Sequence, residues 1–337
     1  MSGGKRYTSG RIALANLSAM IDGLEHARTQ HPAFEDLAAL SNLLFLRGDL
    51  LGRIADHDRA EESALEASAI SPDMGNALFI RARLAARFHR FAEANTLFDQ
   101  AVARGYRPSD VDAERASVLQ ATGHYQEALA IREKLANDDP GIDTLGALAT
   151  LLAEMDRWDA AESCYADALE SDTGVSPVPC GQLLFEWGLN AMRRGDLDRA
   201  EDLFSQLASI LPQHVPGRGH RAEVALARGQ LDLASQLIEP AIAIADDPEY
   251  RATYAEILAA RGDRKAESYA EQAAAEYERL LARRPQAYAD HAAWFFMGIG
   301  RHPQRAVELA RENLKLRDTQ RSRCLLQKAL RNAECAA

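Results

Sequence analysis

The sequence predicts an all-α protein, a right-handed α-solenoid of about eight helix–turn–helix units with a capping helix at each end. Three observations favour this fold. Hydrophobic residues make up 47% of the 337 residues but aromatic residues only 7%, so Ala and Leu dominate, as in closely packed helices. Stretches with the period-two pattern typical of strands are absent. The third observation is a pattern that recurs at near-constant spacing.

The repeat is clearest in "RRGDLDRAEDLFSQLASILP", residues 193–212, where an alanine stands five residues after the loop glycine. Equivalent alanines recur at intervals of 34, 34, 33, 39 and 34 residues, at Ala60, Ala94, Ala128, Ala161, Ala200 and Ala234. Four residues after each alanine stand, in chain order, Ala64, Phe98, Arg132, Tyr165, Phe204 and Ile238. Small residues let the two helices of a hairpin approach closely, and an aromatic ring fills the wedge beside them. The units with Ala64 and Arg132 should therefore pack differently.

Glycine and proline mark the helix ends. Gly123, Gly195 and Gly229 stand at the inner turn, where a left-handed backbone conformation ends the first helix. An Asp just after the glycine can cap the second helix, and a proline stops that helix in several units. A single hairpin cannot bury its apolar face, so neighbouring hairpins must stack.

This pattern resembles the tetratricopeptide repeat over residues 41–319. Several stretches are also similar to a set of uncharacterised bacterial tetratricopeptide proteins: "LLFLRGDLLGRIADHDRAE", "SPVP", "LLFEWGL", "GHRAEV", "AYADHAAWFFM" and "RAVELARENLKLR". That closer resemblance implies the fold and no particular chemistry.

The repeat register sets the expected boundaries. We expect an N-terminal capping segment over residues 1–40, repeats one to four over 41–174, a linker over 175–180, repeats five to eight over 181–319 and a C-terminal capping helix over 320–337. Pro177 and Pro179 should exclude helix from the linker. Extra residues in "RKAESYAEQAAAEYERLLARRP" predict a lengthened second helix in the seventh unit.

Charge and cysteine content exclude several classes of protein. The net charge of -11 argues against nucleic-acid and anionic membrane partners. The four cysteines have neither the spacing of a zinc site nor that of a disulfide framework, so we expect a cytoplasmic protein without cofactors. Neither a signal sequence nor a span long enough to cross a bilayer is predicted.

The first helices of successive tetratricopeptide units line a concave groove. The resemblance implies ligand contacts at Asn42, Phe45, Arg53, Asn76, Phe79, Arg83, Arg87, Gln182, Phe185, Asn190, Arg193, Glu223, Tyr288, His291 and Phe295. Amide side chains such as Asn42 and Asn76 can hold the backbone of an extended peptide. The lysines of the family's carboxylate clamp are not matched.

Three of these residues, Arg53, Arg83 and Arg87, can form a cationic patch for an acidic group of the partner. The alternative is that these arginines pair with acidic residues of neighbouring helices, namely Asp49, Asp56 and Glu61.

Two further stretches allow alternatives. The aromatic run in "AYADHAAWFFMGIG" can form a groove wall, or core beneath the terminal helix. His220 and Glu223 of "GHRAE" lie one helical turn apart and, with His291, give an alternative site for a divalent metal. No established metal, phosphate-binding or nucleophile motif supports that alternative.

The sequence therefore predicts a non-catalytic scaffold or adaptor that binds a protein or peptide in its concave groove. The alternative is a small-molecule or metal-handling protein, including an enzyme, with a pocket between the sixth and eighth units. Self-association into a homodimer, through an uncapped end or the loop around Cys180, is a third hypothesis.

Overall fold

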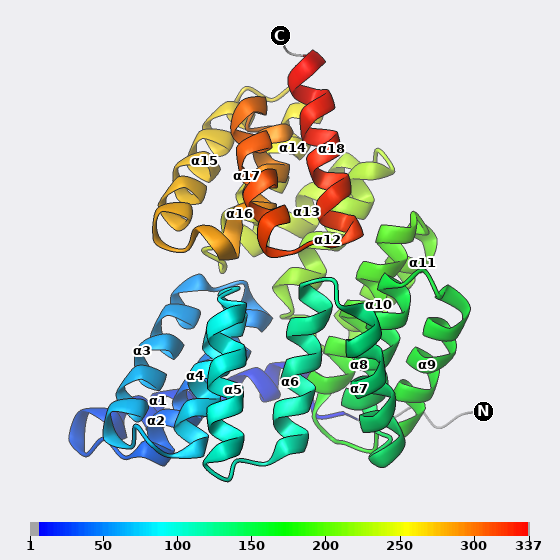
Figure 1. Cartoon of the computed structure of the whole chain (residues 1–337). Helices are drawn as coiled ribbons and strands as arrows, with labels where there is room; N and C mark the ends of the chain where they lie inside the picture. The colour runs from blue at the N-terminus through cyan, green and yellow to red at the C-terminus, as the bar shows by residue number, and fades with distance from the viewer. Residues whose placement is uncertain (1–6, 336–337) are drawn as a thin grey trace.

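The computed structural model describes residues 7–335, which form eighteen helices and no strand (Figure 1). The helices are α1 Gly10–Gln30, α2 Phe34–Leu51, α3 Ile54–Ile70, α4 Gly75–Arg87, α5 Phe91–Ala103, α6 Pro108–Ala121, α7 Tyr125–Asp138, α8 Ile142–Glu154, α9 Trp158–Ser171, α10 Pro177–Arg194, α11 Leu197–Ile210, α12 Val215–Ala227, α13 Leu231–Ile242, α14 Pro248–Ala260, α15 Lys265–Arg283, α16 Pro285–Met297, α17 Pro303–Leu316 and α18 Gln320–Cys335. No helix within these residues combines the length and apolar character needed to cross a bilayer.

The helices pair as antiparallel hairpins, α2 with α3 and so on to α16 with α17, and each hairpin packs against the next. This confirms the all-α solenoid. The first hairpin begins at Phe34, before the boundary expected at residue 41. The second helix of the seventh hairpin, α15, is 19 residues long, as its extra residues predict. The terminal helices α1 and α18 pack against α2 and α17 respectively.

The residues at the repeat positions pack as the sequence predicts. The six alanines at the close-approach position are at most 2% exposed. Phe98, Tyr165 and Phe204, the aromatic residues four positions later, are at most 1% exposed. Gly188 of α10 lies so close to the Phe204 ring that a Cβ there would sit 2.5 Å from it. In the three hairpins that contain these rings, the core is thus a small-residue contact with a ring beside it.

The inner turns also follow the sequence. Gly123, Gly195 and Gly229 have φ values of +88°, +83° and +71°, in the left-handed region that favours glycine. After Gly195, the carboxylate of Asp196 accepts a hydrogen bond from the Arg199 backbone N–H at 3.1 Å and caps α11.

The expectation that Pro177 and Pro179 exclude helix is wrong. Helix α10 begins at Pro177, and both prolines lie in its first turn, where backbone N–H groups have no intrahelical acceptor to lose. Cys180 is consequently buried in a helix and does not lie in a loop. The longer interval between the fourth and fifth units comes mainly from α10 itself, which is 18 residues long, whereas α4, α8 and α12 each have 13.

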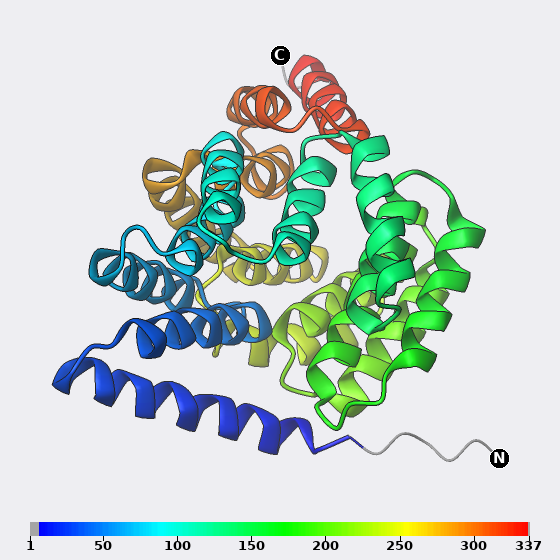
Figure 2. The same cartoon turned by 60° about the horizontal axis from the view of Figure 1, so that its bottom comes forward.

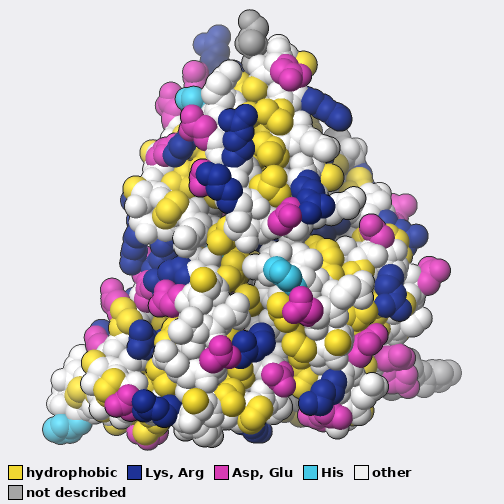
Figure 3. All heavy atoms as spheres, in the orientation of Figure 1, with side chains coloured by type: hydrophobic (Ala, Val, Ile, Leu, Met, Phe, Trp, Pro, Cys, Tyr) yellow, Lys and Arg dark blue, Asp and Glu magenta, His cyan; other side chains and the backbone are white. Residues whose placement is uncertain are grey.

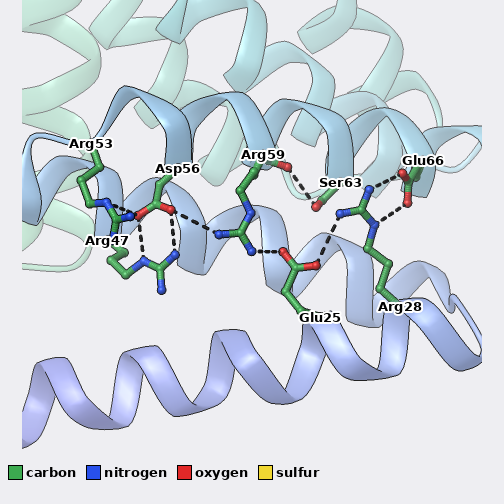
Figure 4. A network of polar contacts seen from close by, with 8 residues as sticks. All are labelled: Glu25, Arg28, Arg47, Arg53, Asp56, Arg59, Ser63 and Glu66. Carbon is green, nitrogen blue, oxygen red and sulfur yellow. Dashed lines mark hydrogen bonds and ion pairs between the residues drawn. The ribbon is translucent and has the colours of Figure 1, made fainter. Parts of the chain in front are cut away.

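A polar network joins α1, α2 and α3 (Figure 4). Arg47 of α2 is bound to Asp56 of α3 by two hydrogen bonds of 2.7 Å, and both side chains are buried. Farther along, Glu25 of α1 pairs with Arg59 of α3. The network continues to the partly exposed pair of Arg28 with Glu66, at 2.6 Å. These contacts fix the N-terminal helix on the first hairpin.

The solenoid curves until its late hairpins reach its early ones (Figures 1 and 2). The carboxylate of Asp246, just before α14, accepts hydrogen bonds from the Ile54 and Ala55 backbone N–H groups at 2.5 and 3.0 Å. Arg284, between α15 and α16, pairs with Asp58 and Glu61 of α3. The concave face is therefore enclosed along part of its length.

We expect Asp246→Ala to lower the free energy of unfolding by about 1–2 kcal/mol, because it removes the acceptor that caps α3 from 192 residues away. Urea unfolding followed by circular dichroism measures the change. Asp232→Ala is the control, since that carboxylate is 84% exposed and its one ion pair within residues 7–335 is with Arg261. Equal stability of the Asp246 variant and the native protein would contradict this role.

Candidate functional site

The first cavity on the concave face lies between α2, α4 and α6 and has a volume of about 270 Å³. We call it the front pocket. Four of the expected ligand residues line it together: Asn42, Phe45, Arg83 and Arg87. They come from the same face of adjacent first helices, as the repeat register predicts.

Both arginines of the front pocket already have acidic partners. Arg83 donates to the Asn42 side-chain oxygen at 2.8 Å and pairs with Glu114 at 2.8 Å. Arg87 pairs with Asp49 at 2.6 Å. Burial alone would raise the pKa of Asp49, but Arg87 and His57 hold it below its ordinary value. An acidic ligand at this pocket has to compete with these internal pairs.

Other expected residues in the first half lie elsewhere. Arg53 stands at the turn between α2 and α3, 3.8 Å from Asp56, and does not line the front pocket with Arg83 and Arg87 (Figure 4). Asn76 is partly buried at the start of α4 and does not line the pocket either. Phe79 is buried and stacks on Tyr106 with ring centroids 4.2 Å apart, so it belongs to the hairpin core.

Helix α10 carries the expected residues of the fifth unit. Gln182 is exposed and donates to Glu186 at 3.1 Å. Asn190 is buried, donates to the Tyr165 hydroxyl at 2.7 Å and accepts from Arg193 at 3.0 Å. Phe185 packs against His214, with ring centroids 4.9 Å apart. Of this set, Asn190 and Arg193 line a second cavity.

That second cavity, the central chamber, has a volume of about 810 Å³ and is lined by parts of α6–α10, α16, the connection between α17 and α18, and α18. Its charged lining residues are Arg132, Asp156, Glu154, Glu186, Arg193, Arg317, Arg321 and Lys328. Five of these eight are cationic, in a protein of net charge -11. Over the face seen in Figure 3, basic and acidic side chains are interspersed.

The chamber was missed by sequence reasoning because helix α18 was expected only to cap the array. Gln320, Arg321, Cys324 and Lys328 of this helix line the chamber. The α17–α18 segment reaches α6, where Arg317 donates to the Ala121 carbonyl at 3.4 Å across 196 residues of sequence. The signal that could have indicated the chamber is Arg132, a charged residue at a position that other units fill with an aromatic ring.

The aromatic residues of the eighth unit lie partly in the hairpin core and partly in the central chamber. Phe295 is buried against Tyr277 and Phe296, both with centroid separations of 5.0 Å, so the expected groove ring is core. Trp294 is 37% exposed and lines the chamber, with Lys328 over its ring at 4.9 Å. Tyr288 is partly buried, and burial raises its pKa to about 12.

The three residues of the alternative metal site are joined by a fourth, Glu249 of α14, which lies next to both His220 and His291. The third, Glu223, lies next to His220. His220 Nδ1 lies 2.9 Å from Glu223, and His220 Nε2 lies 3.9 Å from Glu249. His291 Nδ1 lies 3.1 Å from the other oxygen of Glu249. One ligand atom from each of His220, Glu223 and Glu249 fits within a 4.8 Å span, with His291 behind Glu249.

The electrostatics of this cluster favour charged histidines. Burial alone would lower the pKa of His220 and of His291. The carboxylate of Glu223 outweighs burial at His220 and raises its pKa. Asp290 and the hydrogen bond to Glu249 do the same at His291, whose pKa rises to about 9. The cluster is thus a chain of alternating positive and negative groups when no metal is bound.

The raised pKa of His291 predicts a loss of stability at alkaline pH. Its folded-state pKa of about 9 exceeds the ordinary value of 6.5, so the stabilisation is complete below pH 6.5 and is lost as the pH rises through 9. Because the side chain is 48% exposed, solvent screening limits the effect to about 1 kcal/mol. Urea unfolding at several pH values measures the slope. His291→Gln should flatten it, whereas the exposed control His26→Gln should not; equal slopes in all three proteins would contradict the assignment.

Comparisons with known proteins agree with this geometry. A family model of the tetratricopeptide repeat matches residues 191–257. A Rap protein complexed with competence and sporulation factor is 14% identical, with a TM-score of 0.55 over 95% of this chain and 99% of that one. A tetratricopeptide repeat protein from Parabacteroides merdae is 19% identical, with a TM-score of 0.47 over 83% of this chain and 98% of that one. No curated protein matches the sequence. Residues 191–257 therefore match the tetratricopeptide repeat, and the hairpins on either side of this segment stack in the same way.

Proposed function

We propose that this protein is a non-catalytic scaffold that binds an extended peptide, or a segment of a partner protein, along its concave face. The main support is the continuity of that face. The front pocket and the central chamber share Ser117 and Ala121 of α6, so they adjoin. An elongated, partly enclosed surface of this kind fits an extended chain better than a compact metabolite.

The chemistry of the front pocket suits a peptide backbone. Asn42 and Arg83 present an amide and a guanidinium from adjacent helices, and Phe45 supplies an apolar surface beside them. The internal pairs of Arg83 with Glu114 and of Arg87 with Asp49 can be exchanged for contacts with a partner, because all four side chains are 30–49% exposed. Such pairs are weak, so exchange costs little free energy.

Partner capture with Arg83→Glu/Arg87→Glu tests the proposal. The native protein and the variant are immobilised, and bound proteins are quantified by mass spectrometry. We expect the variant to lose the partners that the native protein recovers, because the pocket then carries only negative charge. Arg107→Glu is the control, since that side chain is 76% exposed and lies outside the pocket. Identical recovery by the native protein and the double variant would exclude the front pocket from binding.

The grouping of His220, Glu223 and Glu249 favours a second candidate function, a divalent-metal protein with the site on α12 and α14. Histidine nitrogen and carboxylate oxygen together suit zinc and similar ions. Metal analysis of protein dialysed against zinc should then give a stoichiometric ion that His220→Ala loses and His26→Ala keeps. Absence of bound zinc in the native protein would reject this candidate and leave the ion-pair interpretation of the cluster.

A further inference from the structure

Arg132 occupies a repeat position at which charge is unexpected. The corresponding residues of three other units are Phe98, Tyr165 and Phe204, all fully buried in their hairpin cores. Arg132 is only 9% exposed, yet it lines the central chamber. Burying a guanidinium where a ring would otherwise pack costs free energy unless some group compensates the charge.

Among the described residues, no charged group is in hydrogen-bond contact with Arg132. Arg132 Nη2 donates to Gln120 at 2.8 Å and to Ser117 at 3.4 Å, and both acceptors are neutral. Its Nε is buried without a hydrogen-bond partner, and no carboxylate of residues 7–335 lies within the 4.0 Å distance of an ion pair. Burial accordingly lowers the pKa of Arg132 to about 10. The Arg132 side chain is therefore a buried cation that no carboxylate of residues 7–335 contacts.

Other arginines of the chamber add to the excess of positive charge. Among the described residues, Arg193 of α10 has a single ion pair, with Glu154 at 3.9 Å. Arg321, at the start of α18, forms no ion pair within residues 7–335. Burial and the charges of Arg193 and Arg317 lower the pKa of Arg321. Glu154 is therefore the one chamber carboxylate whose charge acts on Arg132, Arg193 and Arg321 alike.

We propose that the central chamber binds the phosphate group of a phosphomonoester, held by Arg132, Arg193 and Arg321. A phosphomonoester carries about -1.5 to -2 charges near neutral pH and has three acceptor oxygens, so it can bridge guanidinium groups that a single carboxylate would leave unpaired. The volume of about 810 Å³ lies in the range of small-ligand pockets. The inference rests on the proposed function only in placing the ligand on the concave face. The phosphate belongs either to a phosphorylated side chain of the bound segment or to a free phosphomonoester.

Calorimetric titration of the full chain tests the site, with inorganic phosphate as the first probe and sodium chloride of equal ionic strength as the reference. The decisive variant is Arg132→Phe, which restores the ring found in other units and should leave the protein at least as stable. Arg321→Gln keeps a polar side chain of similar size and breaks no ion pair within residues 7–335, so it should preserve the fold. Arg323→Gln on the same helix is the matched control, because that arginine pairs with Asp318 and does not line the chamber.

We expect saturable binding of phosphate to the native protein and to Arg323→Gln. Arg132→Phe and Arg321→Gln should each bind about tenfold more weakly or worse, since each loses charge-assisted hydrogen bonds. No saturable binding by the native protein, or unchanged affinity in both chamber variants, would overturn the inference. Repeating the titration with a phosphoserine peptide and with adenosine monophosphate identifies the source of the phosphate. Because no partner protein is used, failure here is distinct from failure of the capture experiment at the front pocket.

Discussion

Replacing Asp56 by alanine should lower the free energy of unfolding by about 3–5 kcal/mol. The carboxylate is 1% exposed and accepts two hydrogen bonds of 2.7 Å from Arg47, which is itself 7% exposed. Arg53 and Arg59 lie 3.8 and 3.6 Å from the same carboxylate (Figure 4). Removing the one acid leaves Arg47 charged, buried and unpaired between α2 and α3.

Urea unfolding of Asp56→Ala measures this loss of free energy, and two further variants serve as comparisons. Glu66→Ala removes the exposed end of the same network and should cost less than about 1 kcal/mol. The double variant Arg47→Met/Asp56→Leu removes both buried charges and should recover most of the stability. A loss of less than about 1 kcal/mol in Asp56→Ala would show that water reaches Arg47 and that the pair is not buried.

Phe204→Ala should also cost about 3–5 kcal/mol, because it empties the wedge of the fifth hairpin. The ring is 1% exposed and packs on Gly188, where a Cβ would lie 2.5 Å from it. Leu65→Ala is the control, since that side chain is 55% exposed. Thermal or urea unfolding of both variants gives the comparison, and similar small losses in the two would contradict the wedge role of Phe204.

A double-mutant cycle sharpens this prediction. Gly188→Ala alone should destabilise the protein, because its new methyl group overlaps the Phe204 ring. In Phe204→Ala the same methyl group enters the space that the ring vacates. The double variant should therefore be less destabilised than the sum of the two single variants. Strict additivity would mean that the two residues do not contact each other.

The hairpins could be predicted from sequence because their determinants are local. The alanine spacing and the rings at Phe98, Tyr165 and Phe204 act within one unit, and all lie where the pattern places them. The prediction failed at Pro177 because a proline in the first helical turn loses no hydrogen bond, whereas one in the interior does. Helix α18 begins at Gln320, as expected, but its contribution to the chamber was not foreseen.

The site could be predicted only in part, since much of it depends on closure of the solenoid. Asn42, Phe45, Arg83 and Arg87 meet in the front pocket because repeat register alone brings them together. The central chamber needs the segment between α17 and α18 against α6, and no local pattern encodes a contact across 196 residues. Phe79 and Phe295 were expected in the groove, but burying a ring in the core gains more free energy than leaving it exposed on the concave face.

The central claim is that the repeats curve into an array whose early and late hairpins touch and enclose the concave face. Small-angle X-ray scattering of the full chain tests it most directly. A compact fold of this length has a radius of gyration of about 20 Å, and we expect the measured value to agree with it and the scattering curve to fit the structure. A radius several ångströms larger, with a curve that fits an open and extended solenoid, would contradict the closure and with it the central chamber.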